Sequence, residues 1–400
     1  MFRIMEKKFE LSNKSRIIGK LMNSSMYIVT NDSKATINDI FALGAITDGT
    51  GKVLSPEMPI GVFTKSGYWE IFDPEVEKKK LIVKSSVLGF AIGDAFGVPV
   101  EFLSRNEIRK LKINKMLGNG SHNVPAGSWS DDTSMTVATM DSMIRSNGEI
   151  DYEDIMKCFC DWLANAKYTS LDFTFGVGNI IFRSLIKFSK GIPALECGGK
   201  EFMDNGNGSL MRILPISLYC IINNLSEEET IEIVNNASKI THAHDISKMS
   251  CYIFTEFLRK IIETNDKKNA FQHILNLNYD KYYSEEAIGA YKQLLDVNFP
   301  NIDDVQIKES GYVVDTLESV IYSILNTETY VDAVTMAVNL GYDTDTVAGI
   351  TGAIAGVIYG YDKIPKEWLS ILKKKSYLEK ISEKFYKSIT ECKKEKNQTL

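Results

Sequence analysis

Two short acidic sequences, far apart in the chain, combine carboxylates and hydroxyls in a pattern that suits metal binding. The first is Ser130-Asp131-Asp132-Thr133, and the second is Asp343-Thr344-Asp345-Thr346. Each directly precedes an apolar run with helical spacing. Asp, Ser and Thr are favoured at helix starts because their oxygens accept the unpaired backbone N–H groups there. We therefore expect each acidic sequence to lie at the N-terminus of a helix.

If these two helix starts meet in space, they bring together the oxygen-bearing side chains of Ser130, Asp131, Asp132, Asp343, Asp345 and Thr346. Four carboxylates in a small volume repel one another unless cations neutralise them. Oxygen ligands of this kind suit Mg²⁺, Mn²⁺ or Ca²⁺ better than Zn²⁺. Either sequence alone is typical of a helix cap, but together they predict a site for two cations.

The second acidic sequence leads into a helix that we expect to be buried. Apolar residues recur at helical spacing from Val347 to Val357, and Gly349, Gly352 and Gly356 lie among them. Each Gly costs a helix roughly 0.8–1.0 kcal/mol relative to Ala. Three in one helix therefore indicate that another backbone packs closely against it.

The same helical period dominates the chain from Asp73-Pro74 onward. The first helix is expected to end at Gly97-Val98-Pro99, and residues 265–278 read as a long surface excursion. Further helical patterns cover residues 155–166, 180–188, 227–238, 246–264, 285–295, 314–325, 330–340 and 367–378. Strands and helices do not alternate, so we predict an all-α domain over residues 73–390.

Residues 1–72 have a different pattern and predict a small α+β module of unknown role. Residues 26–30 read as a strand, and residues 61–64 and 68–72 read as a β-hairpin whose turn contains Gly67. A short helix is expected over residues 38–43. This module offers no convincing catalytic set.

The composition excludes several classes of function. The net charge of the 400 residues is −6, which argues against a broad nucleic-acid-binding face. Six cysteines without paired spacing and four histidines leave little on which to build a zinc site. The first residues carry charges where a signal peptide needs apolar ones, and no apolar run reaches the roughly 18 residues of a membrane span. We therefore expect a cytoplasmic protein with no membrane partner.

Further candidate contacts lie in loops at helix ends. Asn205-Gly206-Asn207-Gly208 can be a plain turn, or a loop whose N–H groups approach a phosphate at a helix start. His242 can be a structural histidine or one that contacts a ligand. His242 and His244 are two residues apart and do not share a helix face, so they are not a helical metal pair.

Five stretches in this order resemble the ADP-ribosylglycohydrolase family. They are Gly93-Asp94-Ala95-Phe96-Gly97 followed by Glu101, the two acidic sequences, Asn207-Gly208-Ser209-Leu210-Met211-Arg212, and Thr241-His242. The resemblance runs from about Leu81 to about Leu378. It implies an orthogonal all-α bundle with two Mg²⁺ or Mn²⁺ ions in a cleft.

The resemblance also implies roles for individual residues. The metal ligands would be Ser130, Asp131, Asp132, Asp343, Asp345 and Thr346, and the catalytic acids Glu101 and Asp132. Contacts to the diphosphate and ribose would come from Asn207, Gly208, Ser209 and His242. Tyr342 stands where a Gly is usual, so we expect it to narrow the pocket and alter which substrate fits.

The expected reaction is cleavage of the glycosidic bond between ADP-ribose and a modified protein side chain, most simply arginine. The cation pair would hold the ribose hydroxyls and polarise water. Two alternatives stay open. One is a hydrolase of a small ADP-ribose conjugate, and the other is a non-catalytic binding or immunity protein that docks on an ADP-ribosylating toxin through residues 1–72.

Overall fold

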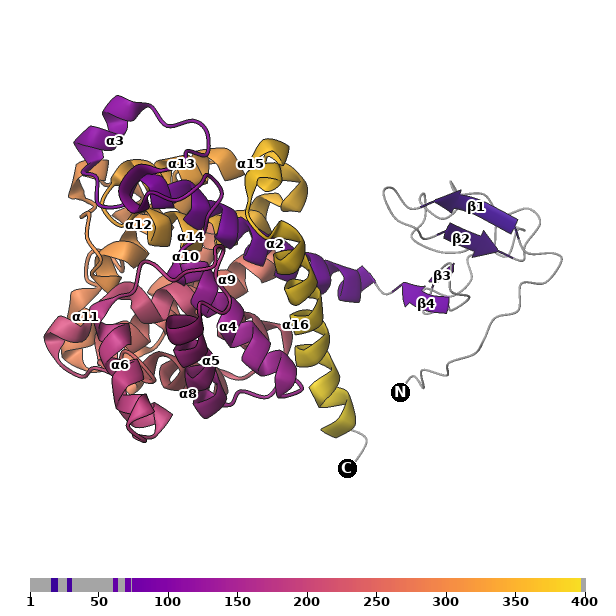
Figure 1. Cartoon of the computed structure of the whole chain (residues 1–400), viewed down its shortest axis with the longest axis horizontal. Helices are drawn as coiled ribbons and strands as arrows, with labels where there is room; N and C mark the ends of the chain where they lie inside the picture. Colours follow the sequence, from indigo (N-terminus) through magenta and orange to yellow (C-terminus); the bar gives the residue numbers. More distant parts are fainter. Residues whose placement is uncertain (1–15, 21–26, 31–59, 64–68, 73, 397–400) are drawn as a thin grey trace. The chain divides into compact units, whose positions relative to one another are not determined.

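The computed structural model describes residues 16–20, 27–30, 60–63, 69–72 and 74–396 (Figure 1). The chain divides into two compact units, residues 1–79 and 80–400. The predicted domain boundary at residues 72 and 73 lies just before α2 (Pro74–Gly97).

The first unit contains an antiparallel sheet in the order β1-β2-β3-β4. The strands are β1 (Arg16–Lys20), β2 (Tyr27–Thr30), β3 (Ile60–Phe63) and β4 (Trp69–Phe72). In the hairpin β3-β4, Ile60 lies opposite Phe72 and Phe63 opposite Trp69. The predicted strand and hairpin are therefore present, and β1 adds a strand that the pattern did not indicate. The helix expected over residues 38–43 lies outside the described residues.

The second unit is built from helices, as predicted. After α2 come α3 (Arg105–Leu111), α4 (Asp131–Arg145), α5 (Tyr152–Asn165), α6 (Asn179–Ser189), α7 (Leu214–Ile222), α8 (Glu227–Lys239), α9 (Asp245–Thr264), α10 (Lys267–Leu275), α11 (Glu285–Ala290), α12 (Val313–Leu325), α13 (Tyr330–Leu340), α14 (Thr344–Tyr359), α15 (Lys366–Ile371) and α16 (Lys375–Lys396). Short 3₁₀ turns connect them, including η1 (Val98–Val100), η2 (Gly120–His122) and η5 (Asn207–Arg212).

One loop prediction and two helix predictions were wrong in detail. The surface excursion expected at residues 265–278 contains α10, because Asp266 caps a helix by accepting the N–H groups of Lys268 and Asn269. The helix expected over residues 285–295 ends at Ala290. The one expected over residues 367–378 is two helices, because the chain leaves helical geometry at Leu372.

Helix α2 is long, apolar and mostly buried. By length and composition alone, residues 75–100 could cross a membrane, although Lys84 and Asp94 interrupt the apolar residues. However, 83% of the apolar window is buried inside the protein, as in the core helix of a folded domain. In the part of the chain that the structure describes, no other helix passes this test.

Helices α2 and α14 lie in direct backbone contact in the middle of the helical unit (Figure 1). A Cβ atom on Gly89 would lie 2.2 Å from the carbonyl oxygen of Gly352, and one on Gly93 would lie 1.9 Å from that of Ala348. This is the close approach that the glycines of α14 predicted. It places the C-terminus of α2 at the N-terminus of α14, where Thr344 Oγ1 donates a hydrogen bond of 2.8 Å to the carbonyl of Gly97.

We expect Gly93→Ala to destabilise the protein by about 1–3 kcal/mol, because the added methyl group forces the two helices apart. The measurement is the free energy of unfolding in urea. Gly289→Ala is the matched control, since Gly289 also lies in a helix but a Cβ there has no atom within 4 Å. Ala is the better helix former, so this control should be neutral or slightly stabilising. Equal effects of both substitutions would contradict the tight packing.

Candidate active site

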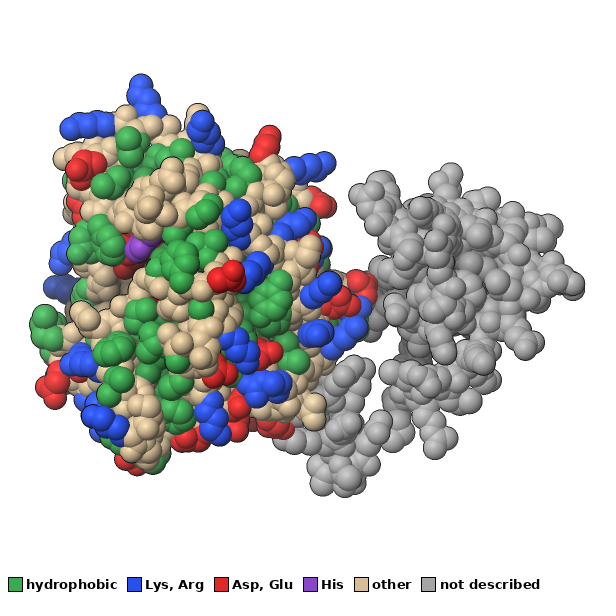
Figure 2. Space-filling view, viewed as in Figure 1, with side chains coloured by type: hydrophobic (Ala, Val, Ile, Leu, Met, Phe, Trp, Pro, Cys, Tyr) green, Lys and Arg blue, Asp and Glu red, His purple; other side chains and the backbone are tan. Residues whose placement is uncertain are grey.

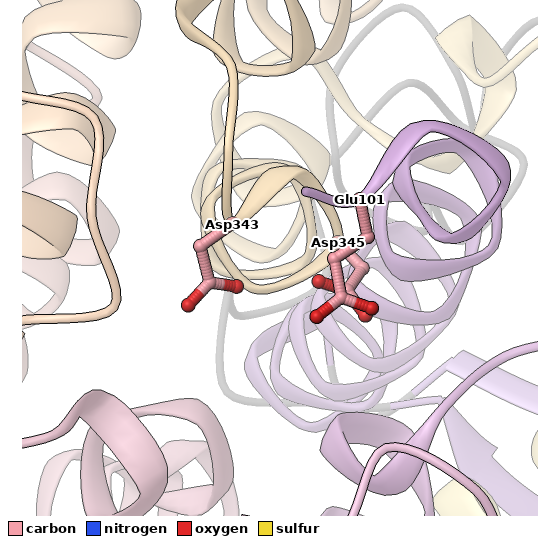
Figure 3. Close-up of side chains that lie close together, drawn as sticks. All are labelled: Glu101, Asp343 and Asp345. Atoms are coloured by element: carbon pink, nitrogen blue, oxygen red, sulfur yellow. The ribbon is translucent and has the colours of Figure 1, made fainter. Parts of the chain in front are cut away.

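Three carboxylates meet at the end of α2 and the start of α14. Glu101 follows η1, Asp343 precedes α14, and Asp345 lies in its first turn. One oxygen from each lies within 4.8 Å of the others. Figure 3 shows the three carboxylates pointing the same way, with Glu101 beside Asp345. Burial raises the pKa of all three carboxyl groups above their ordinary values.

The acidic start of α4 belongs to the same cluster. Asp131 and Asp132 are buried in the first turn of this helix. Burial raises the pKa of Asp131 well above its usual value, and the charge of Glu101 raises it further. The pKa of Asp345 is raised well above its usual value by burial and then by the charges of Glu101 and Asp132. These effects indicate that the acidic start of α4 neighbours the other acids. Among the described residues, the carboxylates whose oxygens lie within 4.8 Å of one another are those of Glu101, Asp343 and Asp345.

Asp94 positions α4 relative to α2. This fully buried carboxylate accepts the backbone N–H groups of Ser130, at 3.0 Å, and of Thr133, at 3.1 Å. It also accepts the hydroxyl of Thr133 at 2.5 Å. Burial raises the pKa of Asp94 to about 6. A side chain of α2 thus satisfies the unpaired N–H groups that begin α4.

Glu101 is held from two sides by η2. Ser121 Oγ donates to its backbone carbonyl at 2.5 Å, and His122 Nε2 contacts its carboxylate oxygen Oε2. This contact raises the pKa of His122. The carboxylate therefore has a fixed orientation next to the other acids.

The loop before α6 passes close to Asp131. A Cβ on Gly176 would lie 2.3 Å from Asp131 Oδ1, and Gly176 has a φ of +82°. Only Gly allows both the left-handed backbone and this approach. The loop therefore covers one side of the acid cluster.

The predicted substrate-binding residues differ in their position relative to the acid cluster. Asn207 Nδ2 donates to Asp343 Oδ2 at 2.7 Å, so Asn207 contacts the cluster directly. Gly208 lies against His242, because a Cβ there would be 2.8 Å from His242 Cε1. Ser209 is fully buried and its hydroxyl bonds to that of Ser238 at 2.9 Å, so its side chain serves the core. Tyr342 is exposed at the edge of the cluster.

His242 is held as a neutral imidazole. It is buried, and its Nδ1 lies 2.9 Å from Thr241 Oγ1. Burial, together with the charge of Arg212, lowers the pKa of His242 to about 3. Arg212 itself donates to Thr241 Oγ1 at 2.7 Å and to the carbonyl of Ala237. His242 can therefore give or accept a hydrogen bond near neutral pH without adding charge.

The donor set fits hard cations. Within residues 74–396, no ion pair joins Asp131, Asp132, Asp343 or Asp345 to a Lys or Arg. Asp132 Oδ1 is buried and has no hydrogen-bond partner. Buried carboxylates without such partners are strongly disfavoured unless a cation or a proton neutralises them.

Sequence reasoning gave no role to two residues of this site. Asp94 was part of a recognised stretch, and the signal that identifies it is a charged side chain within the apolar run of a buried helix. His122 was only counted among the histidines. Its contact with Glu101 joins residues 21 positions apart, and no local pattern indicates it.

Comparisons with known proteins give matches over most of the chain. The family model described as ADP-ribosylglycohydrolase matches residues 77–395. The chain is 32% identical to the ADP-ribosylarginine hydrolase Tri1 of Serratia proteamaculans over 76% of this chain and 78% of that protein. It is 30% identical to the ADP-ribosyl-[dinitrogen reductase] glycohydrolase of Rhodospirillum rubrum over 75% of this chain and 92% of that protein.

A solved structure shares the fold. It is an ADP-ribosylglycohydrolase-related protein complex, 24% identical, with a TM-score of 0.63 over 78% of this chain and 99% of the other.

Proposed function

This chain belongs to the ADP-ribosylglycohydrolase family and is a hydrolase of ADP-ribose conjugates, and from that premise we propose that it releases ADP-ribose from modified arginine side chains with the help of two divalent cations. The main support for the proposal is that one carboxylate oxygen each of Glu101, Asp343 and Asp345 lies within 4.8 Å of the others. Two relatives that are 32% and 29% identical are named ADP-ribosylarginine hydrolases, which favours arginine as the acceptor.

The residues that would hold the cations are the four buried or half-buried aspartates Asp131, Asp132, Asp343 and Asp345, with the hydroxyls of Ser130 and Thr346 beside them. Mg²⁺ or Mn²⁺ bound there would supply positive charge to hold the ribose hydroxyls and to make water a better nucleophile. Asn207 keeps Asp343 in place through its amide hydrogen bond. Asp94 keeps the start of α4 in place.

The chemistry at the sugar needs a base and an acid. The bond between the anomeric carbon and the guanidine nitrogen breaks, and the positive charge that develops on the ring is stabilised by the neighbouring carboxylates. Asp132 Oδ1 is free to accept a proton from the attacking water. Glu101, whose pKa is raised by burial, is suited to hold a proton and deliver it to the leaving guanidine. The products are ADP-ribose and unmodified arginine.

The test is release of ADP-ribose from an ADP-ribosylated arginine protein. We expect release in Mg²⁺ or Mn²⁺, loss of release in a chelator, and recovery when either ion is added back. Parallel substrates are a serine-linked ADP-ribosyl peptide and an acetylated ADP-ribose. The readout is free ADP-ribose measured by chromatography.

The substrate panel separates the proposal from its alternatives. Turnover of the acetylated conjugate without turnover of the arginine protein would favour a small-molecule hydrolase. Binding of ADP-ribose without turnover of any conjugate would favour a binding protein. Arginine cleavage that persists in the chelator would contradict the role of the cations.

A further inference from the structure

Two exposed aromatic side chains flank the acid cluster. Phe102 directly follows Glu101, and Tyr342 directly precedes Asp343. Phe102 is 59% exposed and Tyr342 is 43% exposed, whereas Glu101 is only 8% exposed. The two rings lie edge to face with centroids 6.1 Å apart. They therefore form one aromatic surface beside the buried carboxylates, which we call the aromatic pair.

The backbone fixes the aromatic pair in place. Phe102 N–H donates to the carbonyl of Tyr342 at 2.6 Å, and Tyr342 N–H donates to the carbonyl of Leu103 at 2.8 Å. Both residues have left-handed backbone, with φ of +67° and +62°. A bulky residue rarely adopts this conformation, and such outliers cluster at functional sites. The chain keeps aromatic residues where Gly would be less strained.

Further rings extend this surface. His122 lies 5.9 Å from Phe102 between ring centroids, and Phe175 lies 5.1 Å from His122. On the face shown in Figure 2, hydrophobic side chains gather around a histidine in a hollow. The aromatic pair thus belongs to a larger aromatic rim that includes the partner of Glu101.

We propose that Phe102 and Tyr342 form the subsite that receives the guanidinium of the modified arginine, and that they give the enzyme its preference for arginine-linked ADP-ribose. The inference rests on the proposed function and deepens it. A substituted guanidinium is planar, positively charged and weakly hydrated, so it binds favourably against aromatic faces. Ester- or ether-linked ADP-ribose carries no such cation.

The position of the proposed acid decides which part of the substrate lies here. The aromatic pair adjoins Glu101, which is proposed to protonate the leaving guanidine, so the scissile linkage and its arginine side chain would lie next to the two rings. The diphosphate and the adenine lie further from the bond that breaks. The leaving guanidine, in contrast, must lie near Glu101 to receive its proton. One location therefore serves both binding and departure of the arginine.

The test compares Phe102→Leu and Tyr342→Leu with the wild type. The substrates are an arginine-linked and a serine-linked ADP-ribosyl peptide that differ only at the modified residue. Leu keeps an apolar side chain and the same backbone strain but removes the aromatic face. We expect each variant to raise KM for the arginine-linked peptide about five- to tenfold with little change in kcat. The preference for the arginine linkage should fall by a similar factor.

Tyr377→Leu is the matched control. Tyr377 is 37% exposed, close to the exposure of Tyr342, and lies on α16, which contributes no residue to the acid cluster. Its kinetics should equal those of the wild type. Tyr342→Gly is a second variant that relieves the left-handed strain, so its melting temperature should not fall while its KM for the arginine-linked peptide still rises.

The outcomes separate the two proposals. A wild type that cleaves the arginine-linked peptide, with aromatic variants that keep its KM and its preference, would overturn the subsite alone. A wild type that leaves the arginine linkage intact would overturn the proposed function and the subsite together. An equal rise in KM for both linkages would also overturn the subsite, because the rings would then bind ADP-ribose rather than arginine.

Discussion

Replacing Asp345 by Asn is expected to lower kcat about a thousandfold while the protein stays folded. Asp345 lies within 4.8 Å of both Glu101 and Asp343 and is buried. Asn keeps the oxygen that accepts the N–H of Thr346, a bond of 2.9 Å, so the start of α14 retains its hydrogen bond. What is lost is a negative charge that the proposed cations would require.

Stability distinguishes this loss from unfolding. Burial and the neighbouring charges raise the pKa of Asp345 well above its usual value, which means that its ionised form is unfavourable in the metal-free fold. The melting temperature of metal-free Asp345→Asn should therefore equal or exceed that of the wild type. A kcat within tenfold of the wild type would contradict a central role for Asp345.

Asp332→Asn provides the control for this substitution. Asp332 also lies in the first turn of a helix, α13, but it is exposed. Its carboxylate accepts the hydroxyl of Thr329 at 2.7 Å, and its N–H donates to the same hydroxyl oxygen at 3.0 Å. Its replacement should leave kcat unchanged. A loss of activity in both variants would indicate a general effect of charge removal rather than a role for the cluster.

The fold could be predicted wherever the pattern was local. The helices over residues 227–239 and 330–340 follow directly from apolar spacing and capping residues. The glycines of α14 also indicated close packing. They did not identify α2 as the partner, because Gly89 and Gly93 lie more than 250 positions earlier and pairing between distant segments is set by the whole core.

In the candidate site, too, local patterns were predictable and contacts between distant segments were not. The two acidic sequences were recognisable because each joins several oxygen donors to a helix start. The contacts of Asp94 with Ser130 and of His122 with Glu101 depend on how loops and helices pack, so no spacing rule predicts them. The side chain of Ser209 points into the core, where its hydroxyl accepts that of Ser238, so the predicted contact of Ser209 with the substrate would come from its backbone.

The second large effect is a stabilisation by Mg²⁺ that grows with pH. In the metal-free protein the pKa of Asp94 is raised to about 6, and those of Asp131 and Asp132 are raised well above their usual values. A carboxyl group whose pKa is raised by folding stabilises the protein below its unfolded pKa, near 4, and this stability is lost as pH rises through the folded pKa. The metal-free cluster therefore becomes less favourable from about pH 4 upward.

Bound cations should have the opposite effect on stability as pH rises. Mg²⁺ needs ionised carboxylates, so its affinity rises over the same pH range. At a hundredfold excess over Kd it should stabilise the protein by about 2.7 kcal/mol, which corresponds to a rise in Tm of about 5 °C. We expect the difference in Tm with and without Mg²⁺ to be small near pH 5 and largest near pH 8, measured by thermal unfolding in matched buffers.

Taking the difference at each pH removes the contribution of titrating groups whose protonation is the same with and without the ion. His242, whose pKa is lowered to about 3, makes the fold less stable as pH falls below about 6.5, but it does so equally with and without Mg²⁺. K⁺ at equal ionic strength should leave Tm almost unchanged, and Asp345→Asn should reduce the Mg²⁺ effect at every pH. An Mg²⁺-dependent rise in Tm that stays constant from pH 5 to pH 8 would show that the ion binds somewhere other than the buried carboxylates, since their ionisation would make its affinity rise with pH in this range.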